Sequence, residues 1–344
     1  MLGYVLRRLV ASIPILFGST IAAFGLVTVS GDPLASLKLA NPRPPERVIQ
    51  AEAHRLYLDR PLPEQYWLWL KGLVWEHTFG PSVHEGTQIG AELGSRGLVT
   101  LRLVVLAVAL ALVCAVVTGV VSAVRQYSRT DHTLSLLGLV FLSMPVFWFA
   151  ILLKNAGIWL NQLTGLQLFF TIGDRSVVLA DDSAWGRLTD LAGHLILPTI
   201  VLGLGGYAAW SRFQRAAMLE VLDSDHVRLA RAKGLRPRQV LLRHALRTAL
   251  IPLATVTALD TAALLGGAVI TETVFGWHGL GEFLLDSIRD RDSYAVLGWM
   301  LVSAVIVVAF NLFADLLYGV LDPRIRQGRR GGFGSGLRGG VGHG

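Results

Sequence analysis

The stretch ARAKGLRPRQVLLRHALRTALIP, residues 230–252, is rich in arginine, yet long apolar runs lie on both sides of it. Gly234 stands where a glycine ends a helix, and Pro237 suits the first turn of a second helix. Just upstream, residues 223–225 (Asp-Ser-Asp) offer an N-cap and negative charge at the start of the first helix. The pattern predicts a short helix, a glycine turn and a second helix that continues into the next apolar run.

The composition around this stretch is that of a membrane protein. The chain has 344 residues, of which 53% are hydrophobic and 16% charged, and its mean hydropathy is +0.53. Soluble chains are closer to 25% charged. The net charge of +7 would suggest nucleic acid as the partner of a soluble protein, but membrane proteins collect Arg and Lys in cytoplasmic loops. We therefore expect no nucleic-acid binding.

Six apolar stretches reach or approach the roughly 20 residues that cross a bilayer. They are Leu9–Val29, Leu103–Val124, Leu134–Leu153, Leu195–Ser211, Ala249–Thr271 and Tyr294–Phe313. The first is longer than the apolar region of a signal peptide and has no cleavage site after it, so we interpret it as a retained span. Six spans place both termini on one side of the membrane.

Loop charges indicate which side that is. Nine basic residues lie between Arg212 and Arg247, and the other loops on the same predicted side also carry arginine. Residues 31–97, on the opposite side, hold seven basic and eight acidic residues. Because basic loops remain in the cytoplasm, both termini are predicted to be cytoplasmic.

Two interpretations of the basic segment 212–251 follow from the residues alone. A helical hairpin with many arginines can lie on anionic lipid. Alternatively, a short helix on a rigid stalk can dock on a soluble partner and pass its motion to the spans. Similarly, EQYWLWLKGLVW (64–75) is typical of a membrane interface, but it would also suit a small packed cap.

The chain resembles the inner-membrane permease subunits of ABC importers, in the dipeptide/oligopeptide/nickel branch. The segment 230–252 looks like that branch's EAA loop, although the literal Glu-Ala-Ala is absent and Thr248 replaces a frequent Asn. The other matching stretches are LDRPLPEQYWLWL (58–70), GLVTLRL (97–103), FLSMPVFWFAILL (141–153), TETVFGWHGLGEFLLDSIRDRDSYAVL (271–297) and NLFADLLYGVLDPRIR (311–326). His278 stands where the branch usually has Pro.

The resemblance implies an all-α polytopic membrane protein of the type I ABC importer (MetI-like) kind, with six transmembrane helices and a small external cap. It divides the chain into a first span (1–30), an external segment (31–97), a permease core (98–322) with the coupling loop 212–251, and a Gly/Arg-rich tail (323–344) that we expect to be disordered. It also implies contact with an ATPase through Arg228, Ala230, Arg231, Ala232, Lys233 and Gly234.

Catalytic chemistry is not expected. The sequence has no glycine-rich phosphate loop followed by Lys-Ser or Lys-Thr, so we expect ATP hydrolysis on a partner chain. The chain has a single cysteine, Cys114, and no defensible nucleophile–base pair or metal-ligand cluster. We therefore expect no bound cofactor and no metal.

Polar residues inside a span are candidates for function. Asp260 lies within the fifth span, with Thr257 and Thr261 nearby, and these three are the candidate pathway-lining residues. An acid tied to a neighbouring helix is the alternative. Lys154, at the external end of the third span, is expected to snorkel towards the interface.

The prediction is therefore a permease subunit of a di- or oligopeptide importer in the bacterial inner membrane. Its expected partners are a homologous second permease, two ATPase subunits, an external solute-binding protein and membrane lipid. Nickel, glutathione or another small solute is the alternative substrate. A stand-alone secondary transporter is the rival class, although the sequence shows no clear internal repeat.

Overall fold

The computed structural model describes residues 2–29, 31–176, 178 and 183–321, except for the side chains of 2–5, 261–263, 314–315 and 317–321. Every regular element in these ranges is a helix. In chain order they are α1 (Leu2–Val29), α2 (Ala35–Lys38), α3 (Glu46–Arg55), α4 (Leu62–Lys71), η1 (Gly72–Glu76), α5 (Ile89–Val124), α6 (Arg129–Ser143), α7 (Val146–Thr164), α8 (Ala184–Leu222), α9 (Asp225–Ala232), α10 (Pro237–Gln239), η2 (Val240–Ala245), α11 (Leu246–Phe275), α12 (Leu280–Arg289) and α13 (Ser293–Leu321). The expected tail, 323–344, lies outside the described residues.

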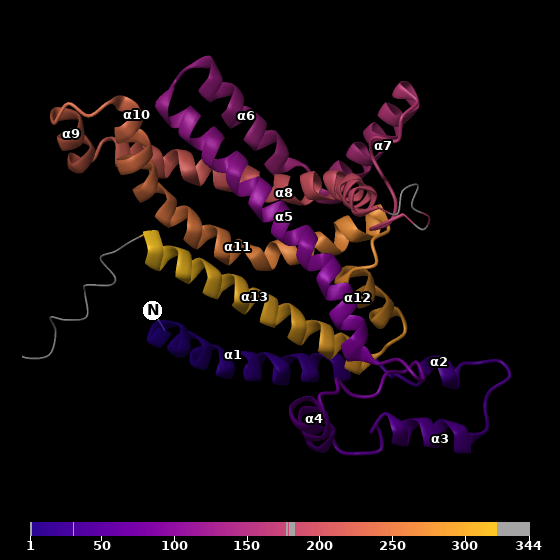
Figure 1. Cartoon of the computed structure of the whole chain (residues 1–344). Helices are drawn as coiled ribbons and strands as arrows, with labels where there is room; N and C mark the ends of the chain where they lie inside the picture. Colours follow the sequence, from indigo (N-terminus) through magenta and orange to yellow (C-terminus); the bar gives the residue numbers. More distant parts are fainter. Residues whose placement is uncertain (1, 30, 177, 179–182, 322–344) are drawn as a thin grey trace, which may run out of the picture.

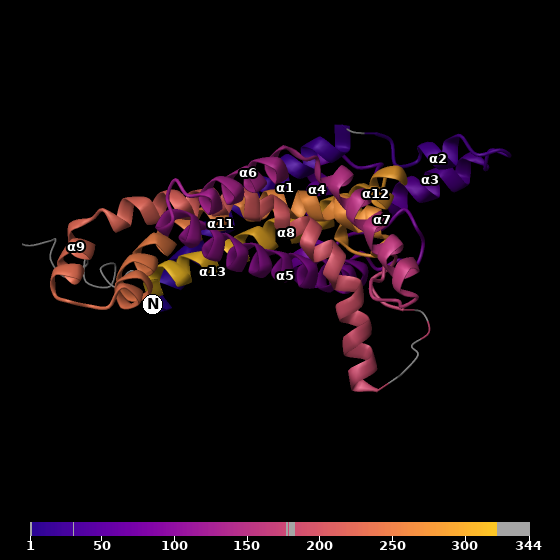
Figure 2. The ribbon, with the colours of Figure 1, turned by 90° about the horizontal axis from the view of Figure 1, so that it is seen from above.

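The long helices lie side by side as an elongated bundle, shown in two views in Figures 1 and 2. The start of α1, the end of α13 and the α9–α10 hairpin share one end of the bundle, whereas α2, α3, α4 and α12 lie at the other (Figure 1). Both ends of the described chain are therefore on the same side, as an even number of spans requires.

Within the described part of the chain, four helices are long and apolar enough to cross a membrane, or up to six if each of two bent helix pairs is one span. The predicted third span is divided, because α6 and α7 meet at 108° around Met144 and Pro145. Proline disfavours a helical conformation in the residue before it, and Met144 is extended. The fifth span bends by 59° between Asp260 and Leu264. The fourth, predicted as a short run, is part of the 39-residue helix α8.

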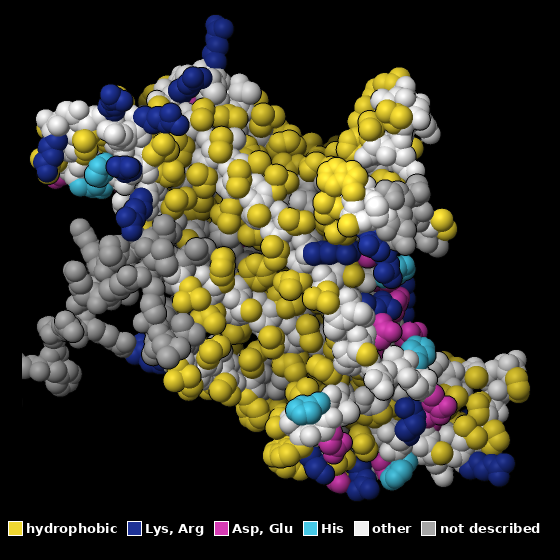
Figure 3. Space-filling view, viewed as in Figure 1, with side chains coloured by type: hydrophobic (Ala, Val, Ile, Leu, Met, Phe, Trp, Pro, Cys, Tyr) yellow, Lys and Arg dark blue, Asp and Glu magenta, His cyan; other side chains and the backbone are white. Residues whose placement is uncertain are grey.

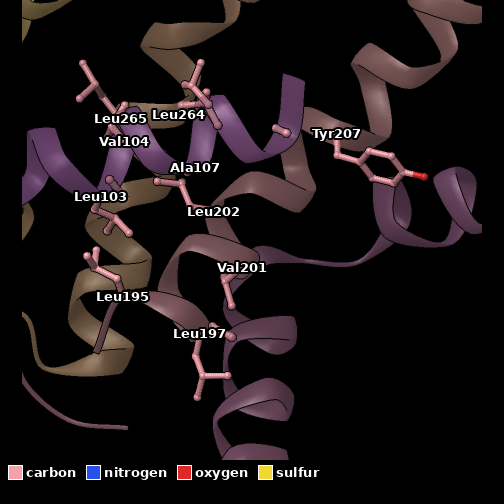
Figure 4. Packing of buried hydrophobic residues seen from close by; sticks show 14 of the residues in the cluster. Leu103, Val104, Ala107, Leu195, Leu197, Val201, Leu202, Tyr207, Leu264 and Leu265 are labelled. Atoms are coloured by element: carbon pink, nitrogen blue, oxygen red, sulfur yellow. The ribbon is translucent and has the colours of Figure 1, made fainter. Parts of the chain in front are cut away.

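The core forms where α5, α8 and α11 cross. Figure 4 shows Leu103, Val104 and Ala107 of α5 against Leu202 of α8 and Leu265 of α11. Small residues allow this close approach, as is usual between helices in lipid, where packing rather than the hydrophobic effect drives association. A Cβ on Gly203 would lie 3.1 Å from the carbonyl oxygen of Ala107, and one on Gly119 would lie 2.8 Å from Gln214.

The surface carries a broad apolar belt between two charged ends (Figure 3). Basic side chains gather over α9 and α10, whereas Asp and Glu are more frequent around α12 and the helices after α1. This distribution follows the loop charges of the sequence, and a belt of this kind suits a hydrocarbon environment.

The segment after α1 folds as a small cap of α2, α3, α4 and η1. Helices α3 and α4 each begin directly after a proline, Pro45 and Pro61, which occupy the N-cap positions. Trp69 is 1% exposed and packs in one cluster with Phe24 of α1 and Leu297 of α13, while Trp67 and Trp75 are 55% and 65% exposed. The interpretation of a packed segment therefore applies to Trp69. Of these three tryptophans, only Trp67 and Trp75 remain exposed for the predicted contact with the membrane interface.

Candidate functional site

The predicted hairpin is present at the end of the bundle. Helix α9 runs from Asp225 to Ala232, and Gly234 follows in the left-handed region with φ of +74°. The Gly234 N–H donates to the carbonyl of Arg231 (3.0 Å), which closes the turn. Ser224 occupies the N-cap position, but its hydroxyl donates back to Val221 O (2.5 Å) instead of capping the helix.

The hairpin is seated on the spans by apolar side chains. Val227 and Ala230 of α9 pack in one cluster with Met218 of α8 and with Val240 and Ala245 of η2. The second helix begins at Pro237 as predicted, but residues 240–245 form a π-helix that was not predicted. Since α11 follows η2 without a break, α9 is packed directly against the base of the fifth span.

The outward face of α9 is basic, with one exposed leucine. Arg231, Ala232, Lys233 and Gly234 are exposed, and so is Arg228, whose pair with Asp225 (3.7 Å) is too solvated to hold it firmly. Ala230 is one of the residues that we expect to contact an ATPase, but its side chain does not lie on the outward face. It is 5% exposed and faces the bundle, so its small side chain seats α9 on the spans.

Leu229 is the residue of α9 that sequence reasoning missed. Its side chain is 57% exposed, between the outward-facing Arg228 and the buried Ala230. The i, i+3 spacing of Val227 and Ala230, which marks the buried face, could have located it. The exposed face of α9 thus presents both charge and an apolar contact.

A buried ion pair lies near the apolar cluster that holds α9. Asp131, at the start of α6, accepts hydrogen bonds from Arg215 Nε (2.8 Å) and Nη2 (2.7 Å) of α8, from the Tyr127 amide (2.9 Å) and from Ser122 of α5. Asp131 is 3% exposed. The arrangement ties α5, α6 and α8 together next to the point where α8 leads into α9. Ser128, three residues before Asp131, was the available sequence signal for an N-cap at this helix start.

Asp260 is half-buried on α11 and accepts a hydrogen bond from Trp210 Nε1 of α8 (2.8 Å). Thr257, one turn earlier, is buried, and the side chain of Thr261 lies outside the described residues. The structure thus brings Asp260 and Thr257 onto one helix near α8. The Trp210 bond joins one carboxylate oxygen of Asp260, Oδ2, to α8.

The far end of α11 is fixed by two polar contacts that the sequence did not suggest. Glu272 is fully buried and accepts hydrogen bonds from Thr100 Oγ1 (2.5 Å) and from the Gly281 amide (2.7 Å). Lys154, which we expect to snorkel, also contacts this end of α11. Its Nζ donates to the carbonyl of Val274 (2.7 Å) near the C-terminal end of α11, where a cation is favourable.

Within the described residues, no group of three or more His, Cys, Asp or Glu side chains has an arrangement that would hold a metal ion. Cys114 is a free, partly buried thiol on α5.

Comparison with known proteins agrees with this architecture. Residues 115–327 match the family described as binding-protein-dependent transport system inner membrane component, and residues 1–92 match its N-terminal part. An inward-facing structure of the MetNI methionine ABC transporter has the same fold, with a TM-score of 0.52 at 16% identity over 67% of this chain and 96% of that one.

Relatives with higher identity cover nearly the whole chain. The oligopeptide transport system permease protein OppB of Mycobacterium tuberculosis (strain ATCC 25618 / H37Rv) is 42% identical over 326 residues, which span 95% of this chain and 99% of that protein. The dipeptide transport system permease protein DppB of Escherichia coli K12 is 38% identical over 339 residues, with the same two coverages. The di/tripeptide transport system permease protein DppB of Pseudomonas aeruginosa (strain UCBPP-PA14) is 38% identical over 341 residues, covering 96% and 100%. These matches and the multi-span helical fold show that the chain belongs to the binding-protein-dependent transport system inner membrane components, the permease subunits of ABC importers.

Proposed function

We propose that this chain forms half of the translocation pathway of an ATP-driven importer of di- and oligopeptides. The observation that carries the proposal is the 38–42% identity, over at least 95% of the chain, to permeases named for oligopeptide, dipeptide and di/tripeptide transport. No relative among these is named for nickel or glutathione, which makes the alternative substrates less well supported.

The proposed assembly contains a homologous second permease, two ATPase subunits and an external solute-binding protein, with lipid around the bundle. The chain itself would bind no cofactor. Both termini and α9 would face the cytoplasm, where the ATPases are. The exposed basic face of α9, at the end of the bundle that also holds the start of α1 and the end of α13, supports this orientation.

The coupling step follows from how α9 is seated. When the ATPases close, they would push on the outward face of α9 through Arg231 and Lys233, with Leu229 as an apolar contact. Val227 and Ala230 are packed against Met218 of α8 and against η2 below α11. Because packed interiors are hardly compressible, a displacement of α9 would be transmitted to both spans.

The test is a pull-down of the tagged chain from its native membrane, as wild type and as an Arg231→Glu, Lys233→Glu variant. We expect the wild type to recover an ATPase and a second permease, and the variant to lose the ATPase only. The matched control is Arg125→Glu, Arg129→Glu, which makes the same change of charge on two exposed residues away from α9. Recovery of the ATPase by both variants, or its loss from both, would contradict docking through α9.

Asp260 is proposed to face the path and to meet the peptide's amino terminus. In Asp260→Asn the Trp210 bond retains an acceptor, so we expect ATPase binding to be unchanged and peptide uptake to fall several-fold through a higher KM. The measurement is uptake of a labelled dipeptide by the reconstituted importer, with nickel and glutathione as competitors. Wild-type kinetics in this variant would make Asp260 a residue of helix packing alone.

A further inference from the structure

Helix α4 and the π-turn η1 that follows it lie across the bundle, not beyond it. Figure 1 shows α4 nearly end-on, beside the last third of α1, while α1 itself runs lengthwise. If the bundle crosses the membrane along its length, α4 lies roughly parallel to the membrane plane. The segment that contains α4 was predicted to be external. The residues of α1 that contact α4 show how deep α4 lies along the bundle.

Contacts of Tyr66 give this depth. The Tyr66 hydroxyl is 2.9 Å from Thr20 Oγ1, and its ring packs edge-on against Phe24 (5.4 Å between centroids) and Phe17 (6.3 Å). Thr20 lies nine residues before the end of α1 at Val29, which corresponds to about 13 Å along the helix axis. The uncharged part of α1 ends at Val29 and the hydrocarbon core is about 30 Å thick, so Thr20 lies at the level of the outer leaflet and Phe17, about 18 Å from that end, lies near the middle of the membrane.

One face of this segment is held by protein and the other is uncovered. Trp69 and Gln65 are buried, and Trp69 Nε1 donates to the carbonyl of Phe79 (3.0 Å). Trp67, Val74 and Trp75 are more than half exposed, and spacings of seven and eight residues, about two turns, place Val74 and Trp75 on the same side as Trp67. The uncovered face is therefore apolar and aromatic.

The charged residues of α4 and η1 are compatible with a position in the outer leaflet. Lys71 is exposed on the face of Trp67 and Trp75, and a lysine can extend its amino group from the acyl region to the headgroups. It lies 3.9 Å from Glu76, and Glu64 is paired with Arg60 (2.9 Å). Both acids thus have basic partners, and the face presents indole rings and one ammonium group to its surroundings.

We propose that α4–η1 is an interfacial helix whose face of Trp67, Val74 and Trp75 lies in the external leaflet and contacts phospholipid. Indole rings favour the boundary between acyl chains and headgroups, and an amphipathic helix there lies in the membrane plane. A water-soluble partner would have to cover these residues at hydrocarbon depth, which the Thr20 and Phe17 contacts make unfavourable. The proposal depends on α1 spanning the membrane and not on the transported solute.

The test is nitroxide labelling of single cysteines in the assembled importer, reconstituted in vesicles of phosphatidylglycerol and phosphatidylethanolamine. Cys114→Ala provides the background, because Cys114 is the single cysteine of the chain. Labels are placed by Trp67→Cys, Val74→Cys and Trp75→Cys; Val74 keeps both indoles in case a tryptophan is needed for folding. Ile21→Cys, exposed on α1, is the lipid control, and Val48→Cys, exposed on α3, is the aqueous control.

We expect the three labels to collide with oxygen more often than with a water-soluble nickel chelate, in a ratio close to that of Ile21 and several-fold above that of Val48. A ratio like that of Val48 would place the face in water or against a soluble partner and would overturn the proposal. Low collision rates with both reagents would mean that protein, such as the second permease, covers the face, and this result would overturn it equally.

Discussion

The two ends of the molecule are held together differently. At the external end, Glu272 and Asp292 are both buried and each accepts several hydrogen bonds from other segments; Asp292 receives them from Ser82 Oγ (2.5 Å) and the Val83 amide (3.0 Å), which ties the cap to the start of α13. At the other end, α9 is seated by the apolar cluster of Val227 and Ala230.

This difference suits the two ends to different tasks. Hydrogen bonds are directional, so a buried network fixes one geometry and is costly to break. Apolar contacts are not directional, so side chains can shift against one another while they remain buried. We infer that the external end keeps its shape while α9 and the bases of α8 and α11 move. The predictions below test this contrast.

The largest expected effect is at Glu272. Glu272→Ala would leave the Gly281 amide and Thr100 without their partner and open a cavity, so we expect about 3 kcal/mol of destabilisation. Thermal unfolding of the detergent-purified protein measures it. Glu272→Gln keeps a hydrogen-bond acceptor and should restore at least half of the loss. An unfolding temperature unchanged in Glu272→Ala would refute the idea of a fixed external end.

Asp131→Ala tests the buried ion pair near α9. It leaves the Arg215 side chain, which is 28% exposed, without its carboxylate, and we expect about 2 kcal/mol of destabilisation. Unfolding of both single variants and of the double variant Asp131→Ala, Arg215→Ala gives the coupling energy. Strict additivity of the two single effects would show that the pair does not join α6 to α8.

Gly234→Val tests the turn behind α9. A branched side chain at φ of +74° costs roughly 1–2 kcal/mol, so the turn should distort and ATP hydrolysis should lose its coupling to transport. Gly86, in the cap, also has a positive φ (+81°) and open space around it. Gly86→Val imposes a similar strain at the other end and should leave coupling intact. The ratio of ATP hydrolysed to dipeptide imported is the measurement, and equal ratios in the two variants would contradict a special role for the α9 turn.

The smallest effect is a pH dependence in the cap. The hydrogen bond from Arg55 holds the pKa of Glu52 below its usual value. Because the folded pKa lies below the unfolded one, this stability is present above the unfolded pKa and is lost as the pH falls through the folded pKa. We expect a loss of less than about 1 kcal/mol below about pH 4.3, the ordinary pKa of Glu. It would be seen as weaker hydrogen-exchange protection of α3, relative to the unfolded chain at the same pH, and would be abolished in Glu52→Gln. Exchange that is equally pH-dependent in both proteins would rule out this ion pair as its cause.

Much of the hairpin could be predicted because its signals are local. The glycine after α9 and the proline that starts α10 act on their own backbone, and both positions are as expected. The burial of Ala230 could not be predicted from the sequence, since which face of a short helix is buried depends on what lies beneath it. The exposure of Leu229 depends on the same packing.

The sequence by itself determined the membrane setting, the position of the apolar runs, the side on which arginine gathers and the turns at Gly234 and Pro237. Each of these depends on composition or on the conformational limits of one residue. Only the tertiary structure decided the 108° bend between α6 and α7, the partners of Glu272 and Asp131, and the depth of Tyr66 beside Thr20. Contacts between Thr100 and Glu272 or between Ser122 and Arg215 join residues far apart in the chain, and the packing of the helices brings them within hydrogen-bonding distance.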